Sequence, residues 1–197
     1  MTKGRVEAFS DGVIAILITI MVLELKVPHE PTLESLKPLL PIFMGYTLSF
    51  VYLGIYWNNH HHMFQAAKHV NGTVLWANLH ILFWISLVPV ATTWVGENPA
   101  DPLPTAIYGV LLVIVAIAYM ILQTCLVRAQ GDDKTMRRAF GSDLKGKLSP
   151  LVYVAGIGGS FIRPWIGQAL YALVALIWLV PDPRIERELI RRKPDIS

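Results

Sequence analysis

The chain has 197 residues, which is room for one domain. Apolar residues make up 54% of it and charged residues only 16%, against roughly 25% charged residues in a typical soluble domain. Residues 70–96 and 103–127 contain no Asp, Glu, Lys or Arg, and each is longer than the ~20 apolar residues that cross a membrane. A helix buried in a soluble protein of this size would keep a polar face, which neither stretch has. The composition therefore excludes an ordinary soluble domain and predicts an all-α integral membrane protein.

Six apolar segments follow one another, and we expect each to be a transmembrane helix of a single membrane domain covering residues 1–197. They are residues 6–27, 38–64, 70–95, 104–128, 148–162 and 164–180. Prolines bound several of them: Pro28 follows the first, and Pro104 begins the fourth. The fifth is glycine-rich, and its 15 uncharged residues reach only ~22 Å of a ~30 Å hydrocarbon core. The pattern therefore does not fix the ends of that helix.

The charges between the segments predict how the chain is oriented. Loops on one side carry fourteen of the 17 Lys and Arg residues, and loops on the other side carry Lys26, Lys37 and Arg163. Because basic residues concentrate in cytoplasmic loops, we expect both termini in the cytoplasm. This placement also explains the net charge of +3 without a nucleic-acid partner.

Asp11 lies a turn or two inside the cytoplasmic end of the first segment. A charged group in a membrane helix costs about 2.5–3.5 kcal/mol at the bilayer centre, and less near the interface, so it usually faces protein or water. Two interpretations fit this residue: an ion or proton site, or a hydrogen-bond acceptor that ties the first helix to a neighbour. The residue pattern alone leaves both open.

Ile16, Ile20 and Leu23 are spaced so that they share one face of the first helix. Such a stripe is commonly a packing or lipid-facing surface. Branched side chains gathered on a symmetry axis, however, form a narrow apolar constriction that gates by dewetting. Thr19 carries the only hydroxyl of this stretch, and it could hydrate an ion or bond back to a carbonyl one turn earlier.

His60, His61 and His62 suggest a metal site, but consecutive helical residues point about 100° apart and cannot converge on one ion. We therefore expect no tightly bound metal. Ser10 and Asp11 are adjacent and point to different faces, which argues against a Ser-His-Asp relay. No nucleotide-binding or phosphate-binding motif is present either, so we expect neither an enzyme nor a cofactor.

Several polar side chains lie near the cytoplasmic ends of the first three segments. Trp57 and His61 share a face of the second helix through their i, i+4 spacing, and Asn78 lies in the third. Polar groups in membrane helices generally bond across helices. We expect some of these side chains to meet Ser10 and Asp11.

Three runs of residues, one in each of the first three segments, form a recognisable signature. They are Arg5, Phe9, Ser10, Asp11, Gly12, Val13, Ala15, Ile16, Thr19 and Leu23, then Tyr56, Trp57, His60 and His61, and then Trp76, Asn78, Leu79, Phe83 and Pro89. Together they resemble the endolysosomal potassium channel family, transmembrane protein 175, and its bacterial homologues. The last three segments resemble that family mainly in layout.

The resemblance implies a channel that conducts K⁺ over Na⁺ through a central pore lined by first helices. Matched by distance from Asp11, hydrophobic pore layers fall on Ile16, Ile20 and Leu23, and a pore-facing hydroxyl falls on Thr19. Ile20 stands where Leu is common, and His62 stands where Arg or Lys is frequent. The resemblance also implies a structural hydrogen-bond network of Arg5, Phe9, Ser10, Asp11, Trp57, His60, His61 and Asn78.

The resemblance also bears on assembly. Animal members of the family carry two six-helix repeats and work as dimers, so a chain with one repeat is expected to form a homotetramer of closed cyclic symmetry. The expected location is the bacterial inner membrane, with lipid and permeant K⁺ ions as partners. The alternative function is a proton-coupled transporter that uses Asp11 and the histidines of the second segment. A membrane-embedded enzyme ranks last, because no catalytic constellation can be placed.

Overall fold

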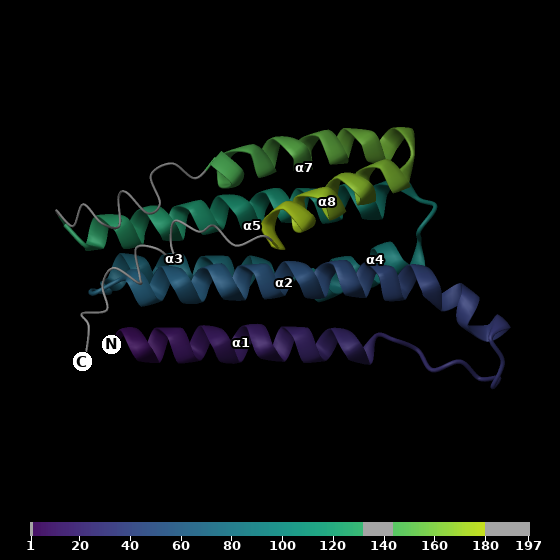
Figure 1. Ribbon diagram of the computed structural model, residues 1–197, viewed down its shortest axis with the longest axis horizontal. Helices are drawn as coiled ribbons and strands as arrows, with labels where there is room; N and C mark the ends of the chain where they lie inside the picture. Colours follow the sequence, from purple (N-terminus) through teal and green to yellow (C-terminus); the bar gives the residue numbers. More distant parts are fainter. Residues whose placement is uncertain (1, 132–143, 180–197) are drawn as a thin grey trace, which may run out of the picture.

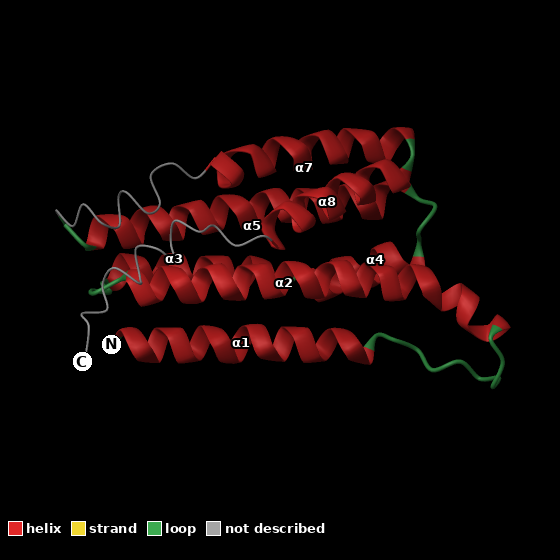
Figure 2. Cartoon of the chain, in the orientation of Figure 1, coloured by secondary structure: helices red, strands yellow, loops and turns green. Residues whose placement is uncertain are grey.

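A computed structural model describes residues 2–131 and 144–179 of the chain. These residues form helices that run nearly along one common direction (Figures 1 and 2). In chain order they are α1 (Lys3–Leu23), the short 3-10 helix η1 (Glu34–Leu39), α2 (Leu40–Ala66), α3 (Gly72–Ile85), α4 (Val88–Glu97), α5 (Pro102–Ala129), α7 (Leu144–Ile162) and α8 (Pro164–Leu179). The expected all-α class is confirmed for the described residues.

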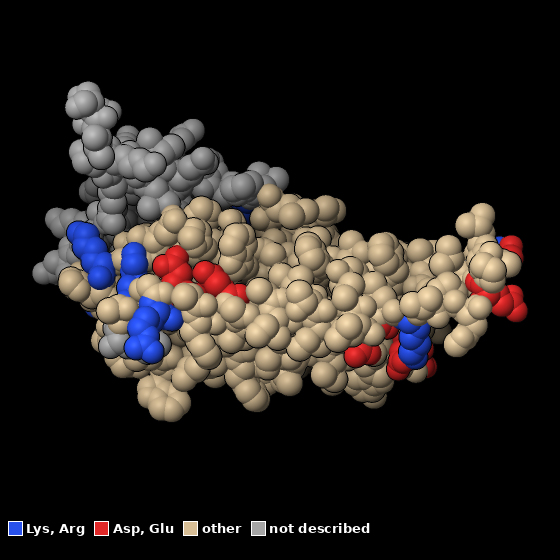
Figure 3. Space-filling model, turned by 90° about the horizontal axis from the view of Figure 1, so that it is seen from below, with Lys and Arg blue, Asp and Glu red and all other residues tan. Residues whose placement is uncertain are grey.

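Four helical stretches among the described residues are long and apolar enough to cross a membrane. They are Lys3–Leu23, Glu34–Ala66, Gly72–Glu97 and Pro102–Ala129, while Pro164–Leu179 is apolar but shorter. Figure 3 shows the face on which α1 lies: charged side chains gather toward its two ends, and a long uncharged surface lies between them. This arrangement is that of a protein whose middle lies in hydrocarbon.

Prolines set two boundaries that differ from the expected ones. The first helix ends at Leu23, with Glu24 as its C-cap, and not at residue 27, where Pro28 disfavours helical geometry in Val27. The third expected segment is two helices, since α3 ends at Ile85 and α4 begins at Val88. Pro89 causes this break: it has no N–H to donate, and its ring crowds the Ile85 carbonyl four residues earlier.

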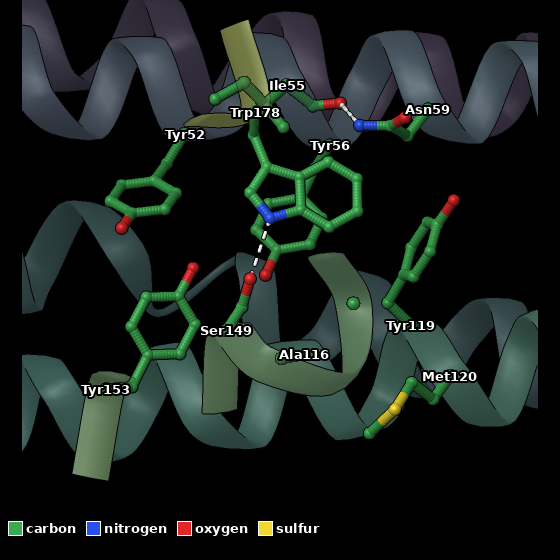
Figure 4. A pocket seen from close by; sticks show the side chains of 11 residues that line it. Tyr52, Ile55, Tyr56, Asn59, Ala116, Tyr119, Met120, Ser149, Tyr153 and Trp178 are labelled. Atoms are coloured by element: carbon green, nitrogen blue, oxygen red, sulfur yellow. Dashed lines mark hydrogen bonds between the residues drawn. The ribbon is translucent and has the colours of Figure 1, made fainter. Parts of the chain in front are cut away.

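The half of the bundle away from α1 is closely packed around α7 and α8. A side chain in place of Gly109 on α5 or Gly156 on α7 would collide with the Tyr171 ring on α8. Small residues at such crossings let membrane helices approach closely, which explains the glycine-rich sequence of the fifth segment. The same half contains a cavity of about 30 Å³ lined by tyrosines, in which Trp178 Nε1 donates to Ser149 Oγ over 2.8 Å (Figure 4). That volume holds about one water molecule.

Candidate pore helix and its anchoring network

The α1 helix lies at one edge of the bundle (Figure 1). It has one buried and one exposed face. The face turned toward α2 and α3 is buried and consists of Val6, Ser10, Ile14, Leu17 and Met21. The opposite face is exposed along the whole helix. Its large apolar side chains are Phe9, Ile16, Ile20, Val22 and Leu23.

The three residues expected to form pore layers lie on this exposed face. Ile16 is 58% exposed, Ile20 is 43% exposed and Leu23 is 78% exposed. Thr19 lies among them, and its hydroxyl donates to the Ile16 carbonyl over 2.8 Å. Its oxygen keeps lone pairs that can accept a hydrogen bond or face a cation. A continuous apolar stripe with one hydroxyl is therefore left uncovered by the rest of the described chain.

A buried chain of hydrogen bonds holds the inner face of α1 against two helices. Asn78 on α3 donates from Nδ2 to Ser10 Oγ over 2.9 Å, and Ser10 Oγ donates to the Val6 carbonyl over 2.8 Å. On its other side Asn78 Oδ1 lies 2.8 Å from His60 Nε2 on α2. Because that amide oxygen can only accept, His60 donates from Nε2. The three side chains are at most 2% exposed. Water cannot reach their polar atoms, so these atoms depend on one another for hydrogen bonds.

A second set of contacts runs along the seam between α1 and α2. Trp57 donates from Nε1 to Asp11 Oδ1 over 3.0 Å, and His61 Nδ1 lies 3.0 Å from Glu7 Oε1. The Trp57 and His61 rings stack at 5.9 Å with 17° between their planes. Because α1 and α2 are antiparallel, a step of one turn on each helix leads from the first pair to the second. Gln65 extends the ladder by another turn, with Nε2 2.8 Å from His61 Nε2.

The ladder ends at the first turn of α1. Lys3 Nζ donates to the Gln65 and Ala67 carbonyls at the end of α2, over 3.4 and 3.2 Å. A cation there binds carbonyls that have no partner within their own helix. The amino-terminal half of α1 is thus held by directional bonds, whereas its carboxyl-terminal half is held by apolar packing.

Two residues expected in the network lie outside it. Arg5 and Phe9 are four residues apart on the exposed face, and Phe9 is 50% exposed. Among the described residues no side-chain hydrogen bond or ion pair is made by Arg5. Glu7 is a member of the network that the sequence did not single out, although it lies four residues before Asp11, on the same face. A carboxylate so near a helix end is easily taken for one that faces water.

At the other end of α1 one ion pair joins the following loop to α4. Lys26 Nζ lies 2.9 Å from Glu97 Oε1. The hydrogen bond to Glu97 and the charge of that carboxylate raise the pKa of the Lys26 ammonium above its usual value. Glu24, the first residue after α1, is exposed beside the stripe.

Comparison with known proteins identifies this helix and its neighbours as a family signature. A family model described as the endosomal/lysosomal potassium channel TMEM175 matches residues 5–89, from α1 into α4. A protein of Chryseobacterium sp. (strain P1-3), named a potassium channel, is 56% identical over 96% of this chain and 98% of its own length. This chain belongs to the TMEM175 family. The resemblance found in the sequence is confirmed, and TMEM175 proteins are ion channels, not enzymes.

Two further TMEM175 comparisons extend over most of the chain. A protein of Streptomyces collinus (strain DSM 40733 / Tue 365), also named a potassium channel, is 32% identical over 93% of this chain and 96% of its own. The crystal structure described as a lysosomal potassium-selective channel TMEM175 homolog from Chamaesiphon minutus matches with a TM-score of 0.77 at 26% identity, covering 90% of this chain and 96% of that one. The fold as a whole, and not only the part that the family model matches, is that of a multi-pass TMEM175 channel protein.

Proposed function

We propose that this chain forms a potassium-permeable channel in which four copies of α1 surround a central pore. The observation that supports this most is the apolar stripe of Ile16, Ile20 and Leu23, which the rest of the described chain leaves uncovered. We take K⁺ as the permeant ion because the relatives that match almost the whole chain are named potassium channels.

The homotetramer follows from the need to enclose a pore with one such helix per chain. A single α1 cannot enclose a path for ions, and closed cyclic symmetry brings the same stripe from each copy to one axis. The tyrosine-lined cavity in the far half holds only about one water. That cavity is too small to serve as an ion path, and we therefore place the path between chains.

The permeation mechanism rests on partial dehydration. A ring of four Ile16 side chains forms an apolar constriction, with Ile20 and Leu23 rings beyond it. An ion that enters must give up part of its water, and such constrictions gate by dewetting. Larger, less strongly hydrated K⁺ is favoured over Na⁺, and the selectivity should be modest because no ring of carbonyls replaces the lost water. Thr19 supplies an oxygen between the apolar layers.

The polar ladder fixes the rotation of α1 about its own axis, which decides which side chains reach the pore. Turning the helix by one residue, about 100°, would replace Ile16 with a neighbour. We place this ladder at the cytoplasmic end of the pore, with both termini in the cytoplasm and the chain in the bacterial inner membrane. The basic residues gathered on that side of the sequence support this orientation.

The test is the reversal potential of the purified protein in liposomes under a K⁺/Na⁺ gradient. The reversal potential of the wild type should shift toward the K⁺ equilibrium potential. Ile16→Asn should lose that shift because an amide wets the constriction. Val22→Asn is the matched control: Val22 is also exposed on α1 but lies about 120° around the helix from Ile16. If Ile16→Asn keeps the wild-type K⁺/Na⁺ ratio, the pore assignment is wrong. Flux that needs a proton gradient and disappears in Asp11→Asn would favour the proton-coupled transporter.

A further inference from the structure

An open groove of about 460 Å³ lies between α2, α4, α5 and α8, away from α1 and its polar ladder. Its walls are mainly apolar and include Met44, Leu48, Val95, Ala169 and Ala172. The lining residues come from the beginnings of α2, α5 and α8 and the end of α4. The groove therefore lies at the end of the bundle where α1 finishes, on the right in Figure 1.

Water is a poor occupant for this groove. Its volume corresponds to roughly fifteen water molecules at ~30 Å³ each, and a stable buried water needs two to four polar partners. Among the polar lining residues, the Tyr108 hydroxyl lies 2.8 Å from Ser49 Oγ, which in turn lies 2.6 Å from Thr92 Oγ1. The wall thus offers few free polar groups, and three of its four helices belong to stretches that can cross a membrane. An apolar guest fits better.

The start of α8 and the turn before it, beside the groove, have a different chemistry. Trp165, at the start of α8, lines the groove and is 66% exposed. Two residues earlier, Arg163 is exposed in the turn between α7 and α8 and is the only basic residue from position 148 to position 179. Trp and Arg are the side chains that anchor a membrane protein at the level of lipid headgroups. Arg also recognises phosphate through charge-assisted hydrogen bonds.

Gln168, which also lines the groove, has an amide with spare hydrogen-bonding capacity. Gln168 Nε2 lies 3.5 Å from Thr105 Oγ1, at the outer limit of a hydrogen bond. A second acceptor could therefore be bound by Gln168. A cation two residues before Trp165, an amide in the lining and an apolar groove complement the phosphate, the glycerol ester and the acyl chain of a phospholipid.

We propose that this groove binds one acyl chain of a phospholipid, whose phosphate lies against Arg163. The lipid comes from the leaflet on the side where α1 ends. This assignment needs only the membrane location of the chain and is independent of which ion the channel conducts.

The experiment is native mass spectrometry of the delipidated protein, titrated with palmitoyl-oleoyl phosphatidylglycerol in mild detergent. Wild type should bind one lipid per chain. Ala172→Trp should abolish this binding, because the larger ring fills the groove. Leu173→Trp is the matched control, since Leu173 is 48% exposed on the same helix and does not line the groove. Ala169→Phe fills the groove from another position and replaces Ala172→Trp if that variant does not fold.

A second arm tests the headgroup. Arg163→Gln should weaken phosphatidylglycerol binding about tenfold, the loss expected for one charge-assisted hydrogen bond. Oleate alone should bind more weakly than the phospholipid, and equal binding would assign the groove to a free fatty acid. Equal lipid binding by wild type and both groove-filling variants would overturn the proposal. An equal loss of lipid binding in Leu173→Trp would also overturn it. A change of oligomeric mass in the groove-filling variants, with lipid binding unchanged, would overturn it as well and would place a second copy of the chain in the groove.

Discussion

Trp57 of α2 donates its indole hydrogen bond to the carboxylate of Asp11, 3.0 Å away on α1. One helical turn along this seam His61 meets Glu7 in the same way. Because the bonds are directional and a turn apart, they hold α1 in one rotation and at one height against α2. The carboxylates thus lie on the inner side of a helix whose other side is the proposed pore wall.

Removing the indole hydrogen bond should loosen this seam. Trp57→Phe keeps a ring that can stack on His61 but leaves the Asp11 carboxylate without its donor. A hydrogen bond to a charged group contributes about 1.5–3 kcal/mol, and the partial exposure of Trp57 places the expected loss of stability near the lower value. Thermal unfolding in detergent measures it. Trp76→Phe is the control, because Trp76 is 75% exposed on α3. An equal loss in both variants would show that ring size, and not the bond to Asp11, is responsible.

The buried hydrogen bond of Asn78 predicts that the stability effects of Asn78→Leu and His60→Phe depend strongly on each other. Asn78→Leu leaves the His60 Nε2 donor buried without an acceptor, so the protein should lose about 1–3 kcal/mol of stability. Adding His60→Phe removes that donor and keeps a ring that can stack on Phe64. In the wild type the His60 and Phe64 ring centroids are 4.4 Å apart. The double variant should therefore be more stable than Asn78→Leu alone. Chemical denaturation of both single variants and the double variant gives the coupling energy, and purely additive losses would contradict the bond between His60 and Asn78.

The hydroxyl of Thr19 can be tested apart from its local bond. Thr19→Val keeps the branched shape and removes the oxygen between the apolar layers, so K⁺ conductance should fall while folding is unchanged. Thr124→Val on α5 is the matched control: Thr124 is exposed and its hydroxyl also bonds back to a carbonyl one turn earlier, that of Met120. Single-channel recording of both variants separates the two roles. A wild-type conductance in Thr19→Val would assign that hydroxyl to its bond with Ile16 alone.

The sequence predicted the helical class because long uncharged runs have few alternatives in a membrane. It did not predict the break between Ile85 and Val88, since a proline inside an apolar run can either bend a helix or end it. The network members on α2 and α3 could be named from the family signature. Which of Arg5, Glu7 and Phe9 joins them depends on the rotation of α1, which only the packed structure fixes.

The groove shows a different limit of sequence reasoning. Its wall residues are ordinary members of apolar helices, and nothing in their spacing sets them apart. The hollow lies between the beginnings of α2, α5 and α8 and the end of α4, and a space between helices leaves no local sequence pattern. In the sequence Arg163 is distinguished only as one of the three basic residues in the less basic set of loops.

The charge of Glu24 should make the K⁺ conductance depend on ionic strength. It is exposed at the end of α1, where the helix carbonyls add negative potential. Lys26, the basic residue nearest to it in sequence, binds Glu97 instead. In the proposed tetramer, four such carboxylates would surround the mouth of the pore opposite the polar ladder and concentrate cations there. Glu24→Gln should therefore lower K⁺ conductance at low ionic strength, and the difference should vanish near 1 M salt, where the screening length is ~3 Å.

Glu34→Gln is the control for this charge, because Glu34 lies on the same side of the membrane but is paired with Lys37, with Nζ 2.7 Å from its Oε2. It should leave conductance unchanged at every salt concentration. The K⁺/Na⁺ ratio should stay at its wild-type value in both variants, since the charge acts before the ion reaches the apolar rings. A loss of conductance in Glu24→Gln that persists at high salt would mean that the residue shapes the end of α1 and does not act through its charge.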